Sequence, residues 1–444
     1  MESEIIERTL SGGEKLRVQT VRFDSFNDMG FMRPPFEKEA FEKLCTLYRE
    51  FTVPSYSFAF GTLVHFYVPE DVEIPDIDGE QPFGRIYDPT VRCNALFRTH
   101  ARLRGGKIVF DNERTERLFS SLEKRGCVHV CRGRRNSLSF LPVAKGMGFI
   151  SRTRKDARLK VNGGFFVMDL FDLGSVYDRV SGPIGLCVKD GRILEPPLFD
   201  REVLMVKNGT VSVGHTSLGE IGILIDGTVY RGGVNARILS RPRCRRSPKG
   251  GTDIVVIGRR VIACRRGGEC DIPSSGFVIH LDSEVTVSDP GVSYSGLEDV
   301  SFAIQGGNSA VRDGNPTEGF ESPFYDFRQF WKVSFPPSMY PLDYVKDRAP
   351  RIVLGADRDG RPMLLWFEGA AKFGHDPKKD SVGASLSEAA RIAAELGMYN
   401  GVHLDGGGSA QIMVNGTRRL KISDRNKDDF SENERAVPMG LYVI

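Results

Sequence analysis

The residues best suited to chemistry are Asp405, the three consecutive glycines Gly406, Gly407 and Gly408, and Ser409. Glycines carry no Cβ, so the backbone N–H groups of such a loop can converge on an anion such as phosphate. The flanking carboxylate and hydroxyl are suited to acid/base catalysis, metal binding or recognition of sugar hydroxyl groups. The structural alternative is a tight connection between strands, in which Asp405 forms an Asx turn.

A second cluster is the run Val161-Asn162-Gly163-Gly164-Phe165-Phe166, which places an amide side chain beside paired glycines. From the residues alone, a bulge that packs two phenylalanines into the core is the favoured interpretation. The alternative is a site in which Asn162 orients a sugar or a phosphate group.

Regular elements must hold the glycine loop in place. A helix is predicted over Ser385 to Leu396 because its apolar residues recur at helical spacing, and Gly397 ends it. The following YNGVHLD is predicted to be a strand that leads into the loop, and the segment after the loop forms a hairpin around Asn415-Gly416. The loop therefore joins two strands, whereas a Walker loop opens a helix.

Short strands separated by turns are typical of the chain from about residue 140 onward. Six dipeptides suit the positive φ angles of tight hairpins, namely Asp190-Gly191, Asn208-Gly209, Asp226-Gly227, Asp313-Gly314, Asp359-Gly360 and Asn415-Gly416. The pattern predicts an α+β fold with a mixed, largely antiparallel sheet and few helices.

Residues 1–140 are expected to form a smaller α+β region of unknown role, and residues 141–444 the domain that carries the site. In the first region we predict a helix from Glu37 to Phe51, paired strands from Tyr56 to Val68, an exposed loop from Pro69 to Gln81 and a second helix from about 112 to 124. No motif in this region indicates a function.

Bulk composition limits the possible partners. The 444 residues include 61 basic and 58 acidic side chains, and the resulting net charge of +3 is too small to attract the whole molecule to nucleic acid or to a membrane surface. The chain shows no secretory segment and no apolar run of bilayer length, so we expect a cytoplasmic protein.

Eight cysteines are irregularly spaced, and free thiols are the expected state. A zinc site built from Cys127, Cys131, Cys264 and Cys270 is the alternative, although their spacing fits no familiar zinc pattern. Small buried apolar groups are the favoured interpretation, so no metal ligands are assigned. No cofactor is certain, and a divalent cation remains open.

Several motifs in this order resemble the phosphodiester glycosidase family from about residue 145 to the C-terminus. The matching segments are VNGGFF, IPSSGFVIHL at 272–281, FAIQGGNSAVRDG at 302–314, APRIVLGADRDG at 349–360, Gly383 with the helix from Ser385, LDGGGSAQIMVNG at 404–416 and NERAVPMGLYVI at 433–444. Four positions differ from the usual family pattern: His403 replaces Asn, Ala410 and Gln411 replace hydroxyl residues, and Ile352 replaces Thr. These changes predict a different sugar specificity.

The resemblance implies a hydrolase that cleaves a glycosyl phosphodiester. Asp405 is then the first candidate for the catalytic carboxylate and Glu434 the second, and Arg351 would clamp phosphate oxygens. Asn162, Gly163, the three loop glycines and Ser409 would bind substrate, and His403 would tune Asp405 or simply be packed. For Glu388 a capping box is favoured, and for Arg435 an ion pair.

Two rival functions remain open. One is a sugar-phosphate or polysaccharide binding protein without turnover, with which the replaced Asn and Thr positions are compatible. The other is a nucleic-acid-associated factor that uses the arginine-rich stretch from Arg231 to Lys249. That stretch could also hold a second phosphate, although a solvated basic loop is the favoured interpretation. The expected partner is a sugar-phosphate or glycan substrate, with no membrane and no nucleic acid; the sequence does not specify the oligomeric state.

Overall fold

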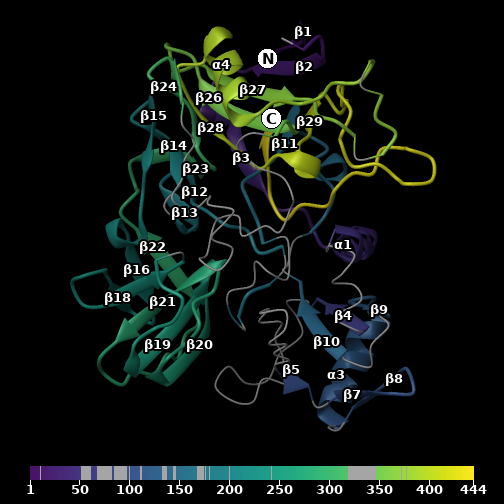
Figure 1. Ribbon diagram of the computed structural model, residues 1–444. Coiled ribbons are helices and arrows are strands. Elements are labelled where there is room, and N and C mark those ends of the chain that lie inside the picture. The colour runs from purple at the N-terminus through teal and green to yellow at the C-terminus, as the bar shows by residue number, and fades with distance from the viewer. Residues whose placement is uncertain are drawn as a thin grey trace.

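The chain folds into several antiparallel sheets with few helices, as the computed structural model shows (Figure 1). The structure describes residues 1–10, 12–51, 62–67, 83–84, 98–99, 101–110, 113–132, 138–143, 147–167, 175, 177–179, 181–199, 201–241, 243–318, 347–371, 373–376 and 378–444. The predicted α+β class, with largely antiparallel strands and few helices, is confirmed.

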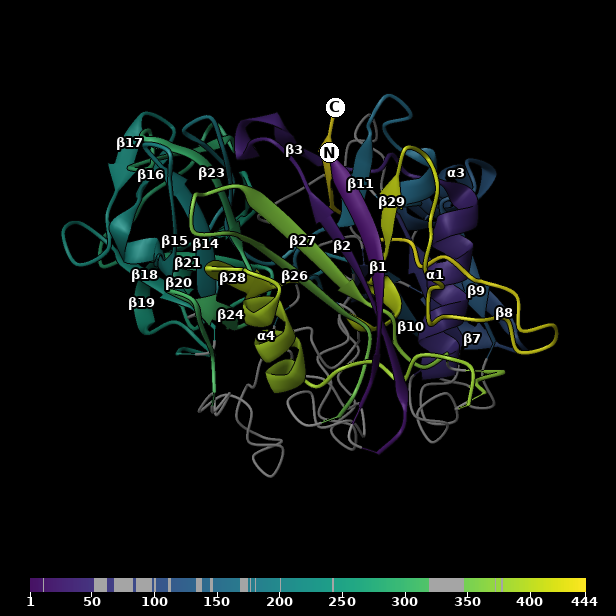
Figure 2. The ribbon, with the colours of Figure 1, turned by 90° about the horizontal axis from the view of Figure 1, so that it is seen from above.

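The largest sheet has seven strands, and every neighbouring pair in it is antiparallel. Its order is β1 (Glu2–Thr9), β2 (Lys15–Arg22), β27 (Pro362–Phe367), β26 (Arg351–Ala356), β28 (Asn400–His403), β24 (Ser309–Arg312) and β25 (Asn315–Pro316). Every residue of β26, β27 and β28 is buried, as expected for strands covered on both faces. Figure 2 shows β1, β2, β27, β26 and β28 side by side, with helix α4 (Leu386–Glu395) beside them.

Two further sheets pack against the first and complete the core around the site. One has the order β29 (Ile412–Val414), β11 (Leu159–Asn162), β30 (Gly440–Val443) and β3 (Met29–Met32). The other has the order β13 (Arg192–Glu195), β12 (Cys187–Lys189), β23 (Val300–Gln305), β14 (Glu202–Lys207) and β15 (Thr210–His215). Fully buried Trp366, Leu441 and Phe302, one from each sheet, belong to the same apolar cluster.

A group of strands lies beyond the five-stranded sheet (Figure 1). It contains a three-stranded sheet of β17 (Thr228–Tyr230), β16 (Gly222–Ile225) and β22 (Val292–Ser295). Beside it lies a four-stranded sheet of β18 (Arg237–Ser240), β21 (Gly276–Leu281), β19 (Lys249–Ile257) and β20 (Arg260–Gly268). These two sheets are called the insert lobe below.

The remaining elements come from the first 142 residues. They are α1 (Lys38–Phe51), α3 (Glu113–Lys124), the sheet of β10 (Leu138–Pro142), β4 (Thr62–Phe66) and β9 (Val128–Cys131), and the small pairs β5 (Phe83–Gly84) with β6 (Arg98–Thr99) and β7 (Ala101–Arg104) with β8 (Lys107–Phe110). Strands β4 and β10 are parallel, which makes the fold mixed. None of the described helices is both long and apolar enough to cross a bilayer.

The predicted helices are confirmed as α1, α3 and α4, and the predicted start of α4 at Ser385 is its N-cap. Strand β4 lies within the predicted strand region Tyr56–Val68, of which residues 56–61 and 68 are outside the described residues. The whole predicted loop Pro69–Gln81 is outside them as well. Five of the six predicted turn pairs have positive φ at both residues, as Asn208 at 50° and Gly209 at 76° illustrate. In the sixth pair only Gly360 is left-handed.

The first three strands join the C-terminal sheets. Strand β2 pairs with β27 and β3 pairs with β30, so residues before 33 contribute to both sheets that flank the site. In β2, Leu16, Val18 and Val21 are fully buried. The predicted boundary at residue 140 therefore does not separate these strands from the rest of the fold, and the division into residues 1–140 and 141–444 stays a prediction.

Candidate active site

The glycine loop begins where β28 ends and carries the chain from the seven-stranded sheet to β29 of the four-stranded sheet. It includes a short 3₁₀ turn over Gly407–Ser409. Gly407 is left-handed, with a φ of 57°. A Cβ on Gly408 would overlap the Arg435 guanidinium and the Asp424 carboxylate, so no larger residue fits there without displacing that pair. The loop is therefore a connection between strands, as predicted; close contacts require glycine at 406 and 408, whereas at 407 only the left-handed φ favours it.

The loop N–H groups do not all face the same way. Gly407 N–H donates to the Pro350 carbonyl oxygen at 2.9 Å, and Ser409 N–H donates to the Gly406 carbonyl oxygen at 3.2 Å. The N–H groups of Gly406 and Gly408 have no backbone acceptor among the described residues. The Gly406 N–H lowers the pKa of Asp405, so it lies close to that carboxylate. The predicted anion-binding role is thus limited to these two glycines.

Asn162 holds the loop from both sides. Its Nδ2 donates to the Asp405 carbonyl oxygen at 2.7 Å, and its Oδ1 accepts from Gln411 N–H at 3.1 Å. The residue is 1% exposed. The structure brings Asn162 and Asp405 together as the sequence predicted, but these hydrogen bonds make the amide a positioning group. The next residue, Gly163, also contacts the loop, since its carbonyl oxygen accepts from Asp405 N–H at 3.4 Å.

The fold shifts the pKa of the Asp405 carboxyl group strongly. Burial raises its pKa from 3.8 to about 6, and the Ser409 hydroxyl, Arg435 and the Gly406 N–H oppose that rise only in part. Although the residue as a whole is partly exposed, its Oδ2 is buried and has no hydrogen-bond partner among the described residues. Ser409 Oγ lies close enough to the Asp405 carboxyl to lower its pKa, but neither it nor the buried Gln411 Nε2 makes a hydrogen bond of good geometry among the described residues. Such atoms occur at other described residues too, Trp366 Nε1 among them, but these three gather within residues 405–411, so their side chains define the candidate site.

Arg435 forms an ion pair with Asp424, which confirms the prediction that Arg435 takes part in an ion pair. Arg435 Nε lies 2.9 Å from Asp424 Oδ2, and Nη2 lies 3.2 Å from Oδ1, a two-pronged contact between groups that are 8% and 6% exposed. Arg435 also lowers the pKa of Asp405, which places positive charge near the catalytic candidate. Sequence reasoning missed Asp424, because nothing in the run Lys421-Ile422-Ser423-Asp424 marks it.

Arg351, the first residue of β26, is 7% exposed. Its Nε donates to the Ala384 carbonyl oxygen at 3.0 Å and its Nη2 to the Asp347 carbonyl oxygen at 2.8 Å. Two of its donors therefore serve the protein backbone, and the proposed clamp on phosphate oxygens stays a prediction.

His403 is buried at the end of β28. Burial, followed by the charge of Arg351, lowers the pKa of its imidazole to about 3. The ring is therefore neutral at physiological pH and cannot transfer a proton as an imidazolium there. Its backbone holds the site together, because Gly307 N–H donates to the His403 carbonyl oxygen at 2.7 Å.

Glu434, the second catalytic candidate, is bound to the scaffold. Its Oε1 accepts from Ser151 N–H at 3.0 Å, and its Oε2 lies 3.8 Å from Arg418 Nη1. The same Arg418 atom donates to Gln411 Oε1 at 3.3 Å, so Glu434 reaches the loop only through two intermediaries. Glu388 forms the predicted capping box with Ser385 and also binds Arg348 at 2.8 Å, which confirms its structural role.

Metal binding has no support among the residues that the structure describes, where no group of three or more His, Cys, Asp or Glu side chains could hold an ion. The cysteines considered for zinc lie on different elements: Cys131 is in β9 and Cys264 is in β20 of the insert lobe. Each described cysteine is a free thiol.

The family model of the phosphodiester glycosidases matches residues 155–444, which is well over half of the chain. The chain therefore belongs to the phosphodiester glycosidase family. Membership indicates a hydrolase of the phosphodiester glycosidase type. The matched region contains Asn162, Arg351 and the whole glycine loop, whereas strands β1 to β3 lie outside it.

Two solved structures illustrate how distant the similar proteins are. The catalytic domain of zebrafish N-acetylglucosamine-1-phosphodiester alpha-N-acetylglucosaminidase, auto-inhibited by its pro-peptide, is 12% identical, with a TM-score of 0.35 and coverage of 100% of this chain and 82% of that one. A hypothetical protein from Synechocystis is 18% identical, with a TM-score of 0.39 and coverage of 68% of this chain. This chain spans about half (54%) of the Synechocystis protein. Among curated proteins, no sequence matches the chain.

Proposed function

We propose that this protein hydrolyses a glycosyl phosphodiester at the bond between the anomeric carbon and the phosphate oxygen. The observation that carries the proposal is the Asp405 carboxyl, whose buried Oδ2 has no partner among the described residues and whose pKa is raised to about 6. A carboxylate of this kind is mostly ionised at neutral pH and remains basic enough to accept a proton.

The proposed reaction needs one carboxylate and a stabilised leaving group. Water attacks the anomeric carbon while Asp405 accepts its proton, the carbon–oxygen bond to phosphorus breaks, and the electron pair leaves with the phosphate monoester. Because the phosphate is already a good leaving group, no second carboxyl is required to protonate it. The Gly408 N–H and the positive charge of Arg435 would stabilise the departing oxygens.

The chain offers a matched pair of variants for the test. We expect Asp405→Asn to lower kcat by about 100-fold or more, because the amide cannot act as a base. Asp190→Asn is the control, since Asp190 is an exposed, left-handed turn residue, and asparagine tolerates that conformation. Release of reducing sugar would be measured over a panel of glycosyl phosphodiesters and nucleotide sugars.

Isotope labelling identifies which bond breaks. In water enriched in ¹⁸O, attack at the anomeric carbon places the label in the released sugar. Label in the phosphate instead would show cleavage at phosphorus and would contradict the proposal, as would unchanged turnover in Asp405→Asn.

A binding protein without turnover is the second candidate. It is favoured by the engagement of Asn162 and Arg351 with the backbone and by the replacement of the usual family asparagine by a neutral His403. Saturable binding of a glycosyl phosphodiester, with no product after prolonged incubation over the whole panel, would support this function in place of hydrolysis.

A further inference from the structure

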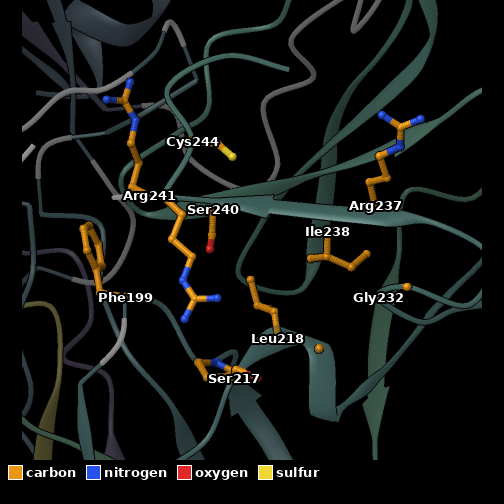
Figure 3. A pocket seen from close by; sticks show the side chains of 13 residues that line it. Phe199, Ser217, Leu218, Gly232, Arg237, Ile238, Ser240, Arg241 and Cys244 are labelled. Carbon is orange, nitrogen blue, oxygen red and sulfur yellow. The ribbon is translucent and has the colours of Figure 1, made fainter. Parts of the chain in front are cut away.

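A cavity of about 380 Å³ lies in the insert lobe (Figure 3). Strand β18 forms one side, and the residues around the short turn Leu218–Glu220 form the other. Figure 3 shows Ser217 and Leu218 facing β18, with Phe199 at one end. The volume of the cavity is within the range of small-molecule sites, roughly 300 to 1,000 Å³.

The lining of this cavity carries positive charge. Arg237, Arg241 and Arg243 all line it, and no described lining residue is an aspartate or a glutamate. Four carboxylates lie near the cavity without lining it: Asp282 pairs with Arg237 at 3.1 Å, Glu220 accepts from the Ser217 hydroxyl at 3.0 Å, and the charges of Asp178 and Asp271 act on Arg241. A surplus of cations in a concave site favours an anionic ligand.

Arg241 is the most buried of the three arginines, with 8% of its surface exposed. Its Nε donates to the Ile272 carbonyl oxygen at 2.9 Å, which fixes the orientation of the guanidinium plane. Burial lowers its pKa, and the charge of Asp178 opposes this effect. Asp178 itself accepts four hydrogen bonds, from the backbone N–H groups of Ser175, Ser274 and Ser275 and from the Ser275 hydroxyl, and these donors stabilise its negative charge. A bound anion would compensate the buried guanidinium further.

Phosphate is the anion that suits this arrangement. Guanidinium groups bind phosphate oxygens through pairs of N–H donors, and the hydroxyl of Ser240 adds a possible donor from the same strand. Gly233 is left-handed, and a Cβ there would meet no atom within 4 Å, so the backbone is open on that side. The apolar side chains of Phe199, Leu218 and Ile238 can contact the uncharged part of a ligand.

We propose that the cavity of the insert lobe binds the phosphate group of a small phosphorylated molecule, at a site separate from the glycine loop. None of the residues that line it belongs to the glycine loop or to the strands that flank that loop. The proposal is independent of whether the glycine loop catalyses hydrolysis.

Calorimetric titration with inorganic phosphate and with glucose 1-phosphate tests this site. We expect both probes to saturate the wild-type protein, with glucose 1-phosphate bound more tightly. Arg243→Gln should weaken both affinities about tenfold, the loss of roughly one charge-assisted contact. Arg243 is exposed, so its replacement is not expected to disturb folding. Arg241→Lys, checked by thermal unfolding, is a second variant that keeps the charge but loses the planar fork.

Two control variants test whether binding is specific to this cavity. Arg266→Gln removes the same charge from β20 of the same sheet, at an exposed residue that pairs with Glu284 at 3.2 Å, and should leave the affinities unchanged. Asp405→Asn tests the glycine loop separately: the binding that Arg243→Gln weakens should persist in this variant. Equal weakening in Arg243→Gln and Arg266→Gln would reveal a general charge effect and overturn the proposal. Absence of saturable binding, binding abolished by Asp405→Asn, or tighter binding of an oligonucleotide than of either probe would overturn it as well.

Discussion

At the scale of single residues, the site depends on a conflict between burial and charge at Asp405. The unfolded chain leaves this carboxyl near its ordinary pKa of 3.8, whereas the folded protein raises the pKa to about 6. A raised carboxyl pKa means that the folded state binds its proton more tightly than the unfolded state does. The ionised form therefore destabilises the fold above about pH 6, and the effect disappears below about pH 4, where both states are protonated.

The raised pKa of Asp405 predicts that Asp405→Asn stabilises the protein only at neutral and alkaline pH. We expect the free energy of unfolding to rise by about 1 to 3 kcal/mol at pH 8 and to change little at pH 4, because asparagine carries no charge at any pH. Denaturant unfolding at both pH values measures this. An equal change at both pH values would show that the carboxylate charge is not the cause.

The loop glycines provide a second prediction at this scale. Gly408→Ala would force a Cβ into the Arg435–Asp424 pair, and we expect a loss of about 3 kcal/mol or more of stability, together with the loss of activity. Gly407→Ala is the matched control, because a Cβ there meets no atom within 4 Å. Only the left-handed φ of 57° disfavours alanine, and we expect it to lower the free energy of unfolding by about 1 kcal/mol. Thermal unfolding of the two variants compares them, and equal losses would show that the ion pair is not the constraint.

At the scale of elements, two sheets contribute the site through the ends of three strands. Strand β28 ends at His403 beside Asp405, β11 ends at Asn162, and β26 begins at Arg351. A residue at a strand end is held by the hydrogen bonds of the sheet on one side and can contact a ligand on the other. Strand ends therefore commonly carry catalytic groups. Asn162 fixes the loop between these two sheets through its hydrogen bonds to Asp405 and Gln411.

At the scale of the whole molecule, the N-terminal strands are part of the sheets that carry the candidate site. Strand β2 pairs with β27 over five residues and lies between β1 and β27. Strand β3 covers the other side of β30 and completes the four-stranded sheet. Their removal would expose the edges of β27 and β30 and the apolar core beneath them.

We therefore predict that a fragment comprising residues 145–444 does not fold into a stable protein, although it contains the whole region matched by the family model. Expression of this fragment beside the full chain, with thermal unfolding of the soluble fraction, measures the effect. A fragment that unfolds cooperatively at the same temperature as the full chain would show that β1 to β3 are dispensable. A fragment comprising residues 10–444 is the control, since it loses only the edge strand β1 and should remain folded.

The sequence by itself determined the helices, the hairpin turns and the candidate loop. Their signals are local: apolar spacing marked α4, Asx-Gly pairs marked five left-handed turns, and three glycines between Asp405 and Ser409 marked the loop. Local signals suffice when the physical cause lies within a few residues, as with φ angles and helix caps.

Only the tertiary structure decided what those residues contact. The pairing of β2 with β27 joins segments more than 340 residues apart, and the burial that raises the pKa of Asp405 arises from the packing of distant elements around it. The tertiary structure alone also places Asp424, which no motif marked, against Gly408. It likewise decides that the Asn162 amide donates a hydrogen bond to the loop. The burial of a residue and its hydrogen-bond partners depend on which strands pack together. The residue types alone do not contain that information.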